Sequence, residues 1–355
     1  MKKKISILTF FFSHNYGAVL QAYAMSNLLI NEGYEVEFID LKTHSANIKP
    51  TFPKSVRDIF ILYKFVSIKR FIKKHFPSVT KPIRSLTELN NYNFNSDLFL
   101  VGSDQVWGLN HTGKSYEAFF LNFVPDKIPK IAFAASFGVS EWGSEVNSKI
   151  TDNVKSLLER FNYIGVREES GVDICTNVFN VQSKHVLDPT LLLGNFDQLI
   201  GDVKQKSHKT LFRYFIHQNI ILNKEVDIIT NLISKHSKIK KWNNIKYIKY
   251  KNPAQWLRTI ASSEFIITDS FHVCCFSIMF RKPFLVYITK KSVSTRITSL
   301  LNELGLANRI VYNSNELNLN ESWQLPIDFD KVYTKLEKMR LESFNELKMA
   351  LSYIK

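Results

Sequence analysis

The sequence predicts an α/β protein made of two doubly wound domains that face a cleft. Apolar strands alternate with helical stretches along most of its 355 residues, the pattern of a parallel sheet covered by helices. The length exceeds that at which one core usually stops growing, and apolar density falls over residues 194–209, the best linker candidate. We therefore expect one domain over 1–193, a second over 194–327, and a C-terminal helix over 328–355 that packs back on them.

The first half is expected to open with a strand, a helix and a second strand. The apolar run from Ile5 to Phe12 is interpreted as a buried strand, residues 18–33 have helical spacing, and residues 34–41 alternate like a strand. Parallel strands need such a crossover helix. Further strands are expected at 97–103, 130–138 and 163–170, a helix at 144–161, and a closing segment at 185–193.

The same alternation returns after the linker. We expect strands at 211–216, 265–270 and 283–288, and helices at 223–236, 251–264, 271–280 and 330–351. In doubly wound sheets, ligands bind beyond the carboxyl ends of the strands. The loops that follow strands are therefore the places where chemistry is expected.

The composition restricts the class of protein. Lys plus Arg total 47 against 32 for Asp plus Glu, a formal charge of +15, which favours phosphorylated metabolites, lipid head groups or nucleic acid as partners. The 3 cysteines suit neither a disulfide framework nor a structural zinc site. The basic N-terminus leads into a short apolar run without a cleavage site, and no stretch of about 18 apolar residues follows, so a cytoplasmic protein is expected.

One segment is unusually basic. Residues 42–84 hold eleven basic residues and one acidic residue, Asp58, interleaved with apolar side chains. This pattern is typical of an amphipathic helix on an anionic membrane surface. It also describes a helical insertion that packs on the domain with its Lys and Arg side chains in water, and we favour this second interpretation.

The sharpest candidate for chemistry lies at residues 265–280. An apolar strand runs into Asp269 and Ser270, and helical spacing starts at once. Ser270 suits the cap of that helix, whose first N–H groups form an anion site. His272 would then meet a bound phosphate or carboxylate and could exchange a proton with it, as imidazole side chains do near neutral pH. The alternative is a capped turn with a partly buried, structural histidine.

Two other polar loops follow strands of the first half. Asn15 and Gly17 lie in the turn after the first strand, where a ligand could approach the backbone; a tight structural turn is the alternative. In the loop after residues 97–103, Asp104 could accept a proton from a sugar hydroxyl and Trp107 could lie against a sugar face. Equally, Asp104 would cap a helix and Trp107 would fill the core.

Arg167 ends a small apolar strand. Its planar guanidinium matches a carboxylate in bidentate fashion, so it is the natural clamp for an acid such as pyruvate. A surface ion pair with Glu168 or Glu169 is the alternative. The Asp188-Pro189-Thr190 segment is interpreted as a structural turn without a catalytic role.

Seven segments, in order, resemble the polysaccharide pyruvyl transferase family. They are NYGAVLQAYA at 15–24, LVGSDQVW at 100–107, IAFAASFG at 131–138, VRE at 166–168, LDPTLLL at 187–193, TDSFHVCCFSIMF at 268–280 and STRITSLLNELGL at 294–306. Any one alone is weak, but together they span roughly residues 5–310, which is most of the chain.

The resemblance implies two Rossmann-like domains in a GT-B-like arrangement, with phosphoenolpyruvate as donor and no metal or cofactor. The pyruvyl group would form a ketal on a sugar of a bacterial surface polysaccharide or its lipid-linked precursor. The family histidine falls on His272 and the family arginine on Arg167. Other branches carry Arg where Ser270 stands and a small residue where Val273 stands, so Arg296 is a candidate for the rest of the anion clamp.

These arguments predict three groups of site residues. The expected catalytic residues are His272, Asp104 and Asp269. The expected donor-binding residues are Arg167, Ser270, Phe271 and Arg296. The expected acceptor-binding residues are Asn15, Tyr16, Gly17, Gln105 and Trp107.

Two other functions fit parts of the pattern. A nucleotide-sugar glycosyltransferase would share the architecture and the basic cleft. A non-enzymatic protein that binds nucleic acid or membrane would use the +15 charge and the 42–84 segment, but it would not need phosphate-type turns inside strand–helix units. We expect phosphoenolpyruvate and a sugar or lipid-linked oligosaccharide as partners and no nucleic acid, with peripheral contact at the inner face of an anionic membrane left open.

Overall fold

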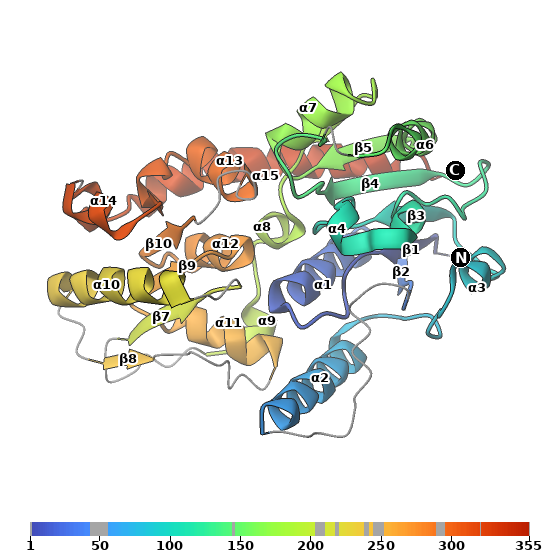
Figure 1. Cartoon of the computed structure of the whole chain (residues 1–355). Coiled ribbons are helices and arrows are strands. Elements are labelled where there is room, and N and C mark those ends of the chain that lie inside the picture. The colour runs from blue at the N-terminus through green and yellow to red at the C-terminus, as the bar shows by residue number, and fades with distance from the viewer. Residues whose placement is uncertain are drawn as a thin grey trace. The chain divides into compact units, whose positions relative to one another are not determined.

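The computed structural model describes residues 2–42, 56–143, 146–202, 210–216, 220–237, 241–243, 252–288, 295–319 and 321–354. The chain forms two compact units, Met1–Leu193 together with Met339–Lys355, and Gly194–Lys338 (Figure 1). The expected C-terminal part, residues 328–355, is thus divided between the units. Expected features that fall partly outside the described residues include the basic segment at 43–55, the helix over 144–161 at 144–145, the linker at 203–209 and the helix over 251–264 at residue 251.

The first unit contains a six-stranded sheet in the order β2-β1-β3-β4-β5-β6. The strands are β1 (Lys4–Leu8), β2 (Glu35–Phe38), β3 (Leu98–Val101), β4 (Lys130–Ala135), β5 (Tyr163–Val166) and β6 (Lys184–His185). Neighbouring strands pair in parallel. The strand order reverses between β1 and β3, which makes this edge the switch point where α/β sheets bind ligands.

Helix α1 (Tyr16–Asn31) is the crossover between β1 and β2. Asn15 caps it, because the Asn15 side chain accepts a hydrogen bond from the Gly17 N–H at 3.0 Å. The helix ends before Gly33, whose φ of +92° is the left-handed conformation that follows many helices. Most side chains of α1 are buried, which explains its apolar composition on all sides.

Further helices lie in the described part of this unit before α15. They are α2 (Val56–His75), α3 (Leu86–Asn90), α4 (Leu109–Thr112), α5 (Tyr116–Phe119), α6 (Ser148–Leu158), α7 (Glu169–Asn177) and α8 (Pro189–Leu193). The C-terminal half of α2 packs on the unit through the buried side chains of Ile68, Phe71, Ile72 and Phe76. The basic segment therefore does contain a helix that packs on the domain, as the favoured interpretation holds.

The second unit contains a five-stranded sheet in the order β11-β10-β9-β7-β8, again with parallel pairing. Its strands are β7 (Thr210–Tyr214), β8 (Lys241–Asn243), β9 (Phe265–Thr268), β10 (Phe284–Tyr287) and β11 (Ile310–Val311). Its helices are α9 (Asp197–Ile200), α10 (Ile220–Ser237), α11 (Pro253–Ala261), α12 (Phe271–Met279), α13 (Thr295–Leu304) and α14 (Ser314–Leu319). The predicted α/β class is confirmed in both units.

Helix α15 (Phe329–Leu351) begins in the second unit and ends in the first. Within the first unit, Ser343 Oγ accepts a hydrogen bond from the Leu187 N–H at 3.0 Å, and Arg340 Nε donates to the Leu191 carbonyl at 2.6 Å. These bonds hold the segment before α8 and the helix α8 itself in place. The helix therefore acts on the candidate site through the position of the segment that contains Asp188.

Candidate active site

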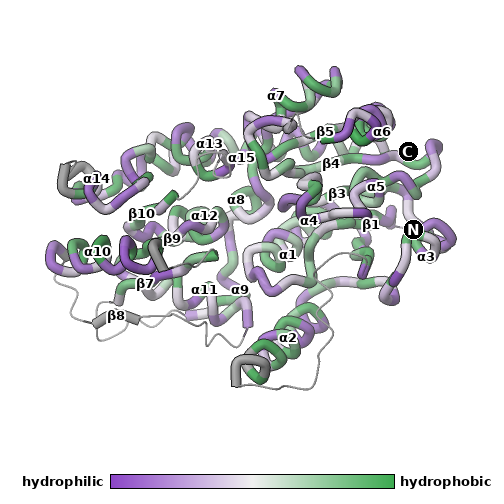
Figure 2. Tube along the Cα trace, viewed as in Figure 1, coloured by the Kyte–Doolittle hydropathy of each residue, from purple (hydrophilic) through white to green (hydrophobic). Residues whose placement is uncertain are grey.

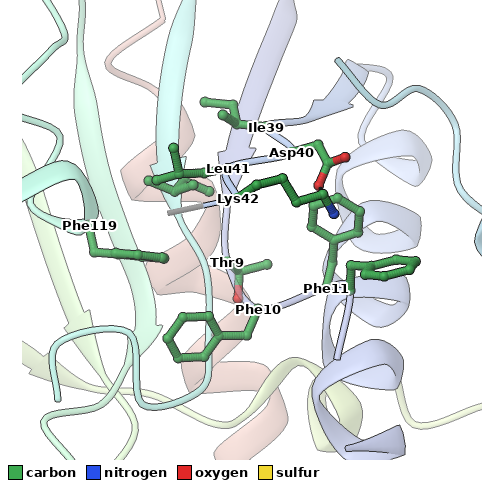
Figure 3. A pocket seen from close by; sticks show the side chains of 10 residues that line it. Thr9, Phe10, Phe11, Ile39, Asp40, Leu41, Lys42 and Phe119 are labelled. Carbon is green, nitrogen blue, oxygen red and sulfur yellow. The ribbon is translucent and has the colours of Figure 1, made fainter. Parts of the chain in front are cut away.

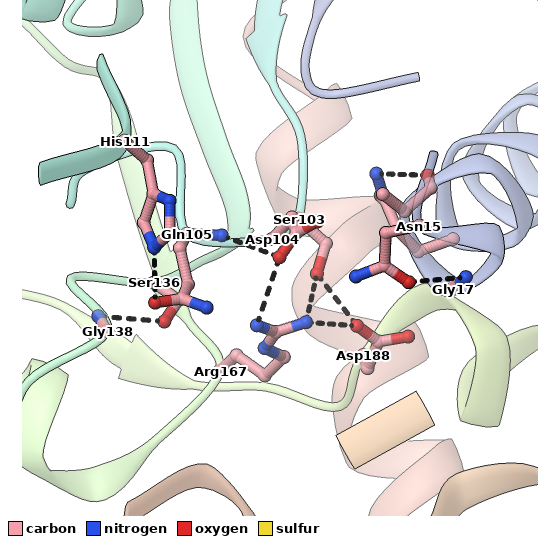
Figure 4. A network of polar contacts seen from close by, with 12 residues as sticks. Asn15, Gly17, Ser103, Asp104, Gln105, His111, Ser136, Gly138, Arg167 and Asp188 are labelled. Carbon is pink, nitrogen blue, oxygen red and sulfur yellow. Dashed lines mark hydrogen bonds and ion pairs between the residues drawn. The ribbon is translucent and has the colours of Figure 1, made fainter. Parts of the chain in front are cut away.

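Polar residues gather where β1, β3, β4 and β5 end, because the carboxyl ends of parallel strands meet at one edge of a sheet. Asp104 and Gln105 follow β3, Arg167 follows β5, and Asn15 precedes α1. Figure 4 shows the hydrogen bonds and ion pairs among these residues. The topology thus brings to one edge the site residues that were predicted in the first half of the sequence.

Arg167 is the centre of a buried network. Its Nη1 donates to Asp188 Oδ2 at 2.8 Å and to Ser103 Oγ at 3.2 Å. Its Nη2 lies 3.8 Å from Asp104 Oδ1. The guanidinium side chain is 1% exposed, so the alternative of a surface pair with Glu168 or Glu169 is wrong.

The charges around Arg167 are mainly negative. Burial alone lowers the pKa of Arg167, but the charges of Asp188, Asp104 and Glu168 raise it above its usual value. The guanidinium therefore stays protonated and is already matched by carboxylates of the protein itself. A further anion would meet net negative charge, so these contacts favour a structural role, and the donor clamp stays a prediction.

Asp104 occupies an uncommon backbone conformation. Its φ is +81°, in the left-handed region that side chains other than glycine seldom adopt. Its Oδ1 accepts a hydrogen bond from the Gln105 N–H at 2.9 Å. The N-cap residue of α4 is Gly108, so Asp104 does not cap that helix. Backbone strain of this kind is frequent at functional sites, and it keeps Asp104 a candidate base.

The loop after β3 holds Gln105 in a defined position. Its Oε1 lies 3.0 Å from His111 Nε2. The φ of Gly138, +75°, lies in the left-handed region that favours glycine, and a Cβ there would stand 2.3 Å from the same oxygen and displace the Gln105 amide. The acceptor role of Gln105 stays a prediction.

Trp107 corrects one expectation. The side chain is 0% exposed, stacks on Phe120 at 5.3 Å between ring centroids, and donates from Nε1 to the Phe119 carbonyl at 3.0 Å. A fully buried ring has no surface for a sugar. Trp107 is therefore a core residue, which was the alternative to sugar binding. Its indole contacts apolar neighbours and has a hydrogen-bond acceptor inside the unit.

The β1–α1 turn contains the other acceptor candidates. Tyr16 and Gly17 are buried, whereas Asn15 keeps partial exposure and is already engaged as the cap of α1.

Beside this turn, a pocket opens at the carboxyl ends of β1 and β2 (Figure 3). It is lined by Leu8, Thr9, Phe10, Phe11, Phe12, Ile39, Asp40, Leu41, Lys42 and Phe119. Lys42 pairs with Asp40 at 2.6 Å and lies 4.3 Å from the Phe12 ring centroid, so its charge is satisfied.

In the second unit, the β9–α12 junction has the predicted form. Ser270 caps α12 by accepting from the Val273 N–H at 3.5 Å, and the Ser270 N–H donates to Thr268 Oγ1 at 3.0 Å. Asp269 Oδ1 accepts from the Ile216 N–H at 2.7 Å, which ties the turn to the loop after β7. Asp269 therefore orders the turn, one of the two roles considered for it.

His272 stands in the first turn of α12, next to Phe271, with 5.4 Å between the ring centroids. His272 is 3% exposed. Burial of this kind suits both a proton donor in a closed site and a structural histidine, and mutation separates the two. Arg296 lies on a different helix, α13, and is partly buried.

The sequence matches the model of the polysaccharide pyruvyl transferase family over residues 15–290. The chain belongs to the polysaccharide pyruvyl transferase family. Membership identifies a transferase of polysaccharide biosynthesis, with a sugar or polysaccharide as acceptor. A comparison with curated proteins found no match.

Several solved structures share the GT-B-like fold of this pyruvyl transferase. Arabidopsis thaliana UGT89C1 complexed with quercetin gives a TM-score of 0.53 at 12% identity, covering 100% of both chains. A mutant O-GlcNAc transferase of Thermobaculum terrenum gives 0.53 at 10% identity over 99% of this chain and 67% of the other. S. aureus MnaA with UDP gives 0.51 at 11% identity over 99% and 97%. These likenesses confirm the GT-B-like class, and at such identities they concern the fold alone.

Some residues of the pyruvyl transferase site escaped the sequence analysis. Asp188 and Ser103 complete the Arg167 network, although Asp188 was interpreted as part of a structural turn and Ser103 had no role. Ser103 ends the predicted strand 97–103, which was the available signal for it, whereas Asp188 lies inside the closing segment 185–193 and had no such signal. Within the described residues, no helix combines the length and apolarity needed to cross a bilayer.

Proposed function

We propose that this pyruvyl transferase moves the pyruvyl group of phosphoenolpyruvate onto a sugar of a bacterial surface polysaccharide or of its lipid-linked precursor, without a metal or cofactor. The observation that carries the proposal is the capped β9–α12 turn, which holds His272 in the first turn of a helix. Helix starts bind phosphate, and an imidazole there is placed to exchange a proton with a phosphorylated donor.

The reaction joins one donor carbon to two sugar oxygens. C2 of the enol forms bonds to two hydroxyl oxygens of the sugar, its bond to the phosphate oxygen breaks, and C3 becomes a methyl group. One hydroxyl proton replaces the proton delivered to C3, and the other leaves with inorganic phosphate. Because protonation at C3 makes C2 electrophilic, the step needs a general acid more than a strong nucleophile.

His272 is the proposed acid. The N–H groups of the first turn of α12 would hold the departing phosphate, with Ser270 fixing the geometry of that turn. Asp104 and Asp269 are the proposed bases, and the hydrogen bond from Ile216 favours an ordering role for Asp269. Arg167 is proposed to bind the donor carboxylate, although its hydrogen bond to Asp188 favours a structural role.

Replacing His272 tests this assignment. We expect His272→Ala to lower transfer at least about a hundredfold, the usual size of a general-acid effect, while the melting temperature changes little. The assay follows phosphate release from phosphoenolpyruvate with a lipid-linked saccharide fraction, together with thermal unfolding. His236→Ala, at an exposed histidine on α10, is the matched control and should keep wild-type turnover. Wild-type turnover in His272→Ala would remove this residue from the mechanism.

A nucleotide-sugar glycosyltransferase is the second candidate function. The similar structures favour it, since UGT89C1 has been solved with UDP-L-rhamnose and MnaA with UDP. Thermal shifts separate the candidates, because a ligand stabilises the state that binds it. Stabilisation by phosphoenolpyruvate and not by UDP-sugars supports pyruvyl transfer, and the reverse supports glycosyl transfer.

We also propose peripheral contact with the inner face of an anionic membrane through α2. Ile59, Tyr63 and Val66 are 54%, 49% and 36% exposed, at spacings of four and three residues that place them on one helix face. The same spacing continues into the exposed cations Arg70 and Lys73. Figure 2 shows hydrophobic and hydrophilic stretches alternating along α2. An apolar stripe beside cations suits an anionic lipid surface.

Vesicle binding tests this contact. We expect the protein to float with phosphatidylglycerol vesicles and not with phosphatidylcholine vesicles, and added salt to weaken the binding. The double variant Arg70→Gln, Lys73→Gln should bind about thirtyfold more weakly, since each cation near such a surface contributes about 1 kcal/mol. Lys127→Gln, an exposed lysine elsewhere, is the control. Equal binding to both kinds of vesicle would contradict an electrostatic contact.

A further inference from the structure

A cavity of the second unit lies between the end of α13 and the first turns of α15. It encloses about 180 Å³, less than the roughly 300–1,000 Å³ of pockets for drug-sized ligands, so it suits a small molecule. All of its described lining residues belong to the second unit. They are Leu304, Gly305, Leu306, Asn308, Arg309, Pro326, Ile327, Asp328, Lys331, Val332 and Lys335.

The cavity and the β9–α12 turn lie at opposite edges of the second sheet. Arg309 directly precedes β11, which pairs in parallel with β10, and β10 pairs in parallel with β9. The cavity is therefore at the amino ends of these strands. His272 follows the carboxyl end of β9. A ligand in the cavity is therefore not the donor that is proposed to meet His272.

Arg309 is a buried cation in the wall of this cavity, with 2% of its surface exposed. Its Nη1 donates to the Trp323 carbonyl at 2.6 Å and its Nη2 donates to the Leu325 carbonyl at 2.5 Å, which holds the segment before Pro326 in place. Its Nε has no hydrogen-bond partner among the described residues. Burial lowers the pKa of Arg309, and no neighbouring carboxylate raises it again. Neutral carbonyls thus hold the guanidinium without balancing its charge.

Lys331 and Lys335 add positive charge at the same cavity. Both are exposed, and their spacing of four residues places them on one face of α15. Lys335 Nζ donates to the Glu303 carbonyl at 3.3 Å. Among the described ion pairs, none includes Arg309 or either lysine.

Asp328 is the one carboxylate among the described lining residues. Its Oδ1 accepts from the Lys331 N–H at 3.1 Å, which caps the start of α15. The described lining therefore contains three cations and one carboxylate, and it carries an excess of positive charge. A buried charge is normally paired, so an anion is the simplest complement.

Part of the cavity wall is apolar. The buried side chains of Leu304, Leu306 and Val332 form it. Apolar walls lower the local dielectric, which strengthens the attraction between a bound anion and the cations beside it. Hydrocarbon on a ligand would also gain free energy by leaving water for this wall. The cavity therefore suits an anion with a compact hydrocarbon body better than an inorganic ion.

We propose that this cavity binds a small organic anion, which is not consumed in the transfer reaction. Lys331 and Lys335 contact the anionic group, the buried charge of Arg309 adds to the attraction, and the hydrocarbon body lies against the apolar wall. The ligand is a carboxylate, sulfonate or phosphate ester of small size. This inference goes beyond the proposed pyruvyl transfer and does not depend on it.

Acetylation of single lysines tests the site, with benzenesulfonate as the probe. Acetic anhydride modifies neutral amino groups at mildly alkaline pH, and mass spectrometry gives the rate at each lysine. Saturating benzenesulfonate should slow the reaction of Lys331 and Lys335 about tenfold, because the bound anion pairs with their amino groups and covers them. Lys338, an exposed lysine of α15 outside the described lining, is the internal control and should react at an unchanged rate.

Two further probes separate the charge from the hydrocarbon body. Benzyl alcohol has the ring without the charge and should protect neither lysine. Inorganic sulfate has the charge without the ring and should protect only at concentrations at least about tenfold higher, since it buries no apolar surface. Equal protection by sulfate and benzenesulfonate would overturn the organic class of the ligand. Unchanged rates at Lys331 and Lys335, or equal protection of Lys338, would overturn the site.

Variants at the exposed lysines test the same site without disturbing the buried arginine. In calorimetric titrations, the double variant Lys331→Met, Lys335→Met should bind benzenesulfonate at least about tenfold more weakly than the wild-type protein. Lys338→Met is the matched control and should bind as the wild type does. Wild-type affinity in the double variant would contradict the proposal.

Competition with the donor separates this site from the proposed transfer site. Saturating phosphoenolpyruvate should leave the affinity for benzenesulfonate unchanged, because the two ligands bind at opposite edges of the sheet. Displacement of benzenesulfonate by phosphoenolpyruvate would place both in one site and overturn the inference. If His272→Ala kept full transfer activity while benzenesulfonate still protected Lys331 and Lys335, the proposed mechanism would fail and the anion site would stand.

Discussion

Two clusters of charge at the same edge of the first sheet are built in opposite ways. At the end of β5, Arg167 is buried against Asp188, with Asp104 at 3.8 Å. At the end of β1, Lys64 and His14 share a half-buried space without a described carboxylate. In the first cluster, carboxylates of the protein balance the positive charge of Arg167. In the second cluster, no described carboxylate balances the positive charge of Lys64.

The difference separates structure from binding. A buried cation with its own carboxylates fixes three loops of the protein, and it has little attraction left for a ligand. A buried cation without an acid makes the folded state less stable, which evolution tolerates mainly where a ligand supplies the missing charge. Net charge of the surroundings, more than the presence of a basic residue, therefore indicates where an anionic substrate binds.

The largest expected effect concerns the complete cluster. Arg167→Met should lower the free energy of unfolding by about 3–5 kcal/mol, because it leaves the buried Asp188 and Asp104 without their cation. Urea denaturation followed by circular dichroism measures the change. Arg281→Met, at an exposed ion pair with Asp330, is the control and should leave stability nearly unchanged, because solvent screens such a pair.

The same variant can break the comparison. If Arg167→Met folded with wild-type stability and lost only its affinity for phosphoenolpyruvate, Arg167 would be a donor clamp. The distinction between the two clusters would then fail. A loss of stability together with unchanged donor affinity in the remaining folded protein would establish Arg167 as a structural residue.

The long elements of the fold were predictable because their periodicity extends over many residues. The predicted helices 223–236 and 330–351 correspond to α10 and α15, and the predicted strand 265–270 contains β9. By contrast, β6 and β11 have two residues each, too few to show a period of two. Their strand character comes from pairing with β5 and β10, which sequence does not reveal.

The site was predictable in its positions but not in its partners. Loops after strands identified Asp104, Arg167 and His272. That Arg167 pairs with Asp188, 21 residues later, depends on how β5 and the segment before α8 pack. Lys64 gave a local signal that was not used: it lies three residues after Ile61 and four before Ile68, on the apolar side of α2.

A smaller change in stability, of opposite sign, is expected at the cluster of Lys64 and His14. Lys64→Met should raise the free energy of unfolding at pH 7 by about 2 kcal/mol, because burial disfavours the charged lysine and methionine fills the same space. Thermal and urea unfolding without added anions measure it. Lys127→Met, at an exposed lysine, should change stability by less than about 0.5 kcal/mol.

The pH dependence makes this last test specific. The folded-state pKa of Lys64, about 8, lies below its usual value of 10.5, so between these pH values the unfolded chain binds more protons. The stability of the wild-type protein therefore gains a contribution from Lys64 as pH rises from 8 to 10.5, and the advantage of Lys64→Met shrinks over that window. The pKa of His14 is lowered from its usual value and so lies below this window, which leaves Lys64 as the group of the cluster that titrates within it. An advantage that stayed constant from pH 7 to 10 would mean that the gain comes from packing, and the charge argument for the β1 cluster would lose its basis.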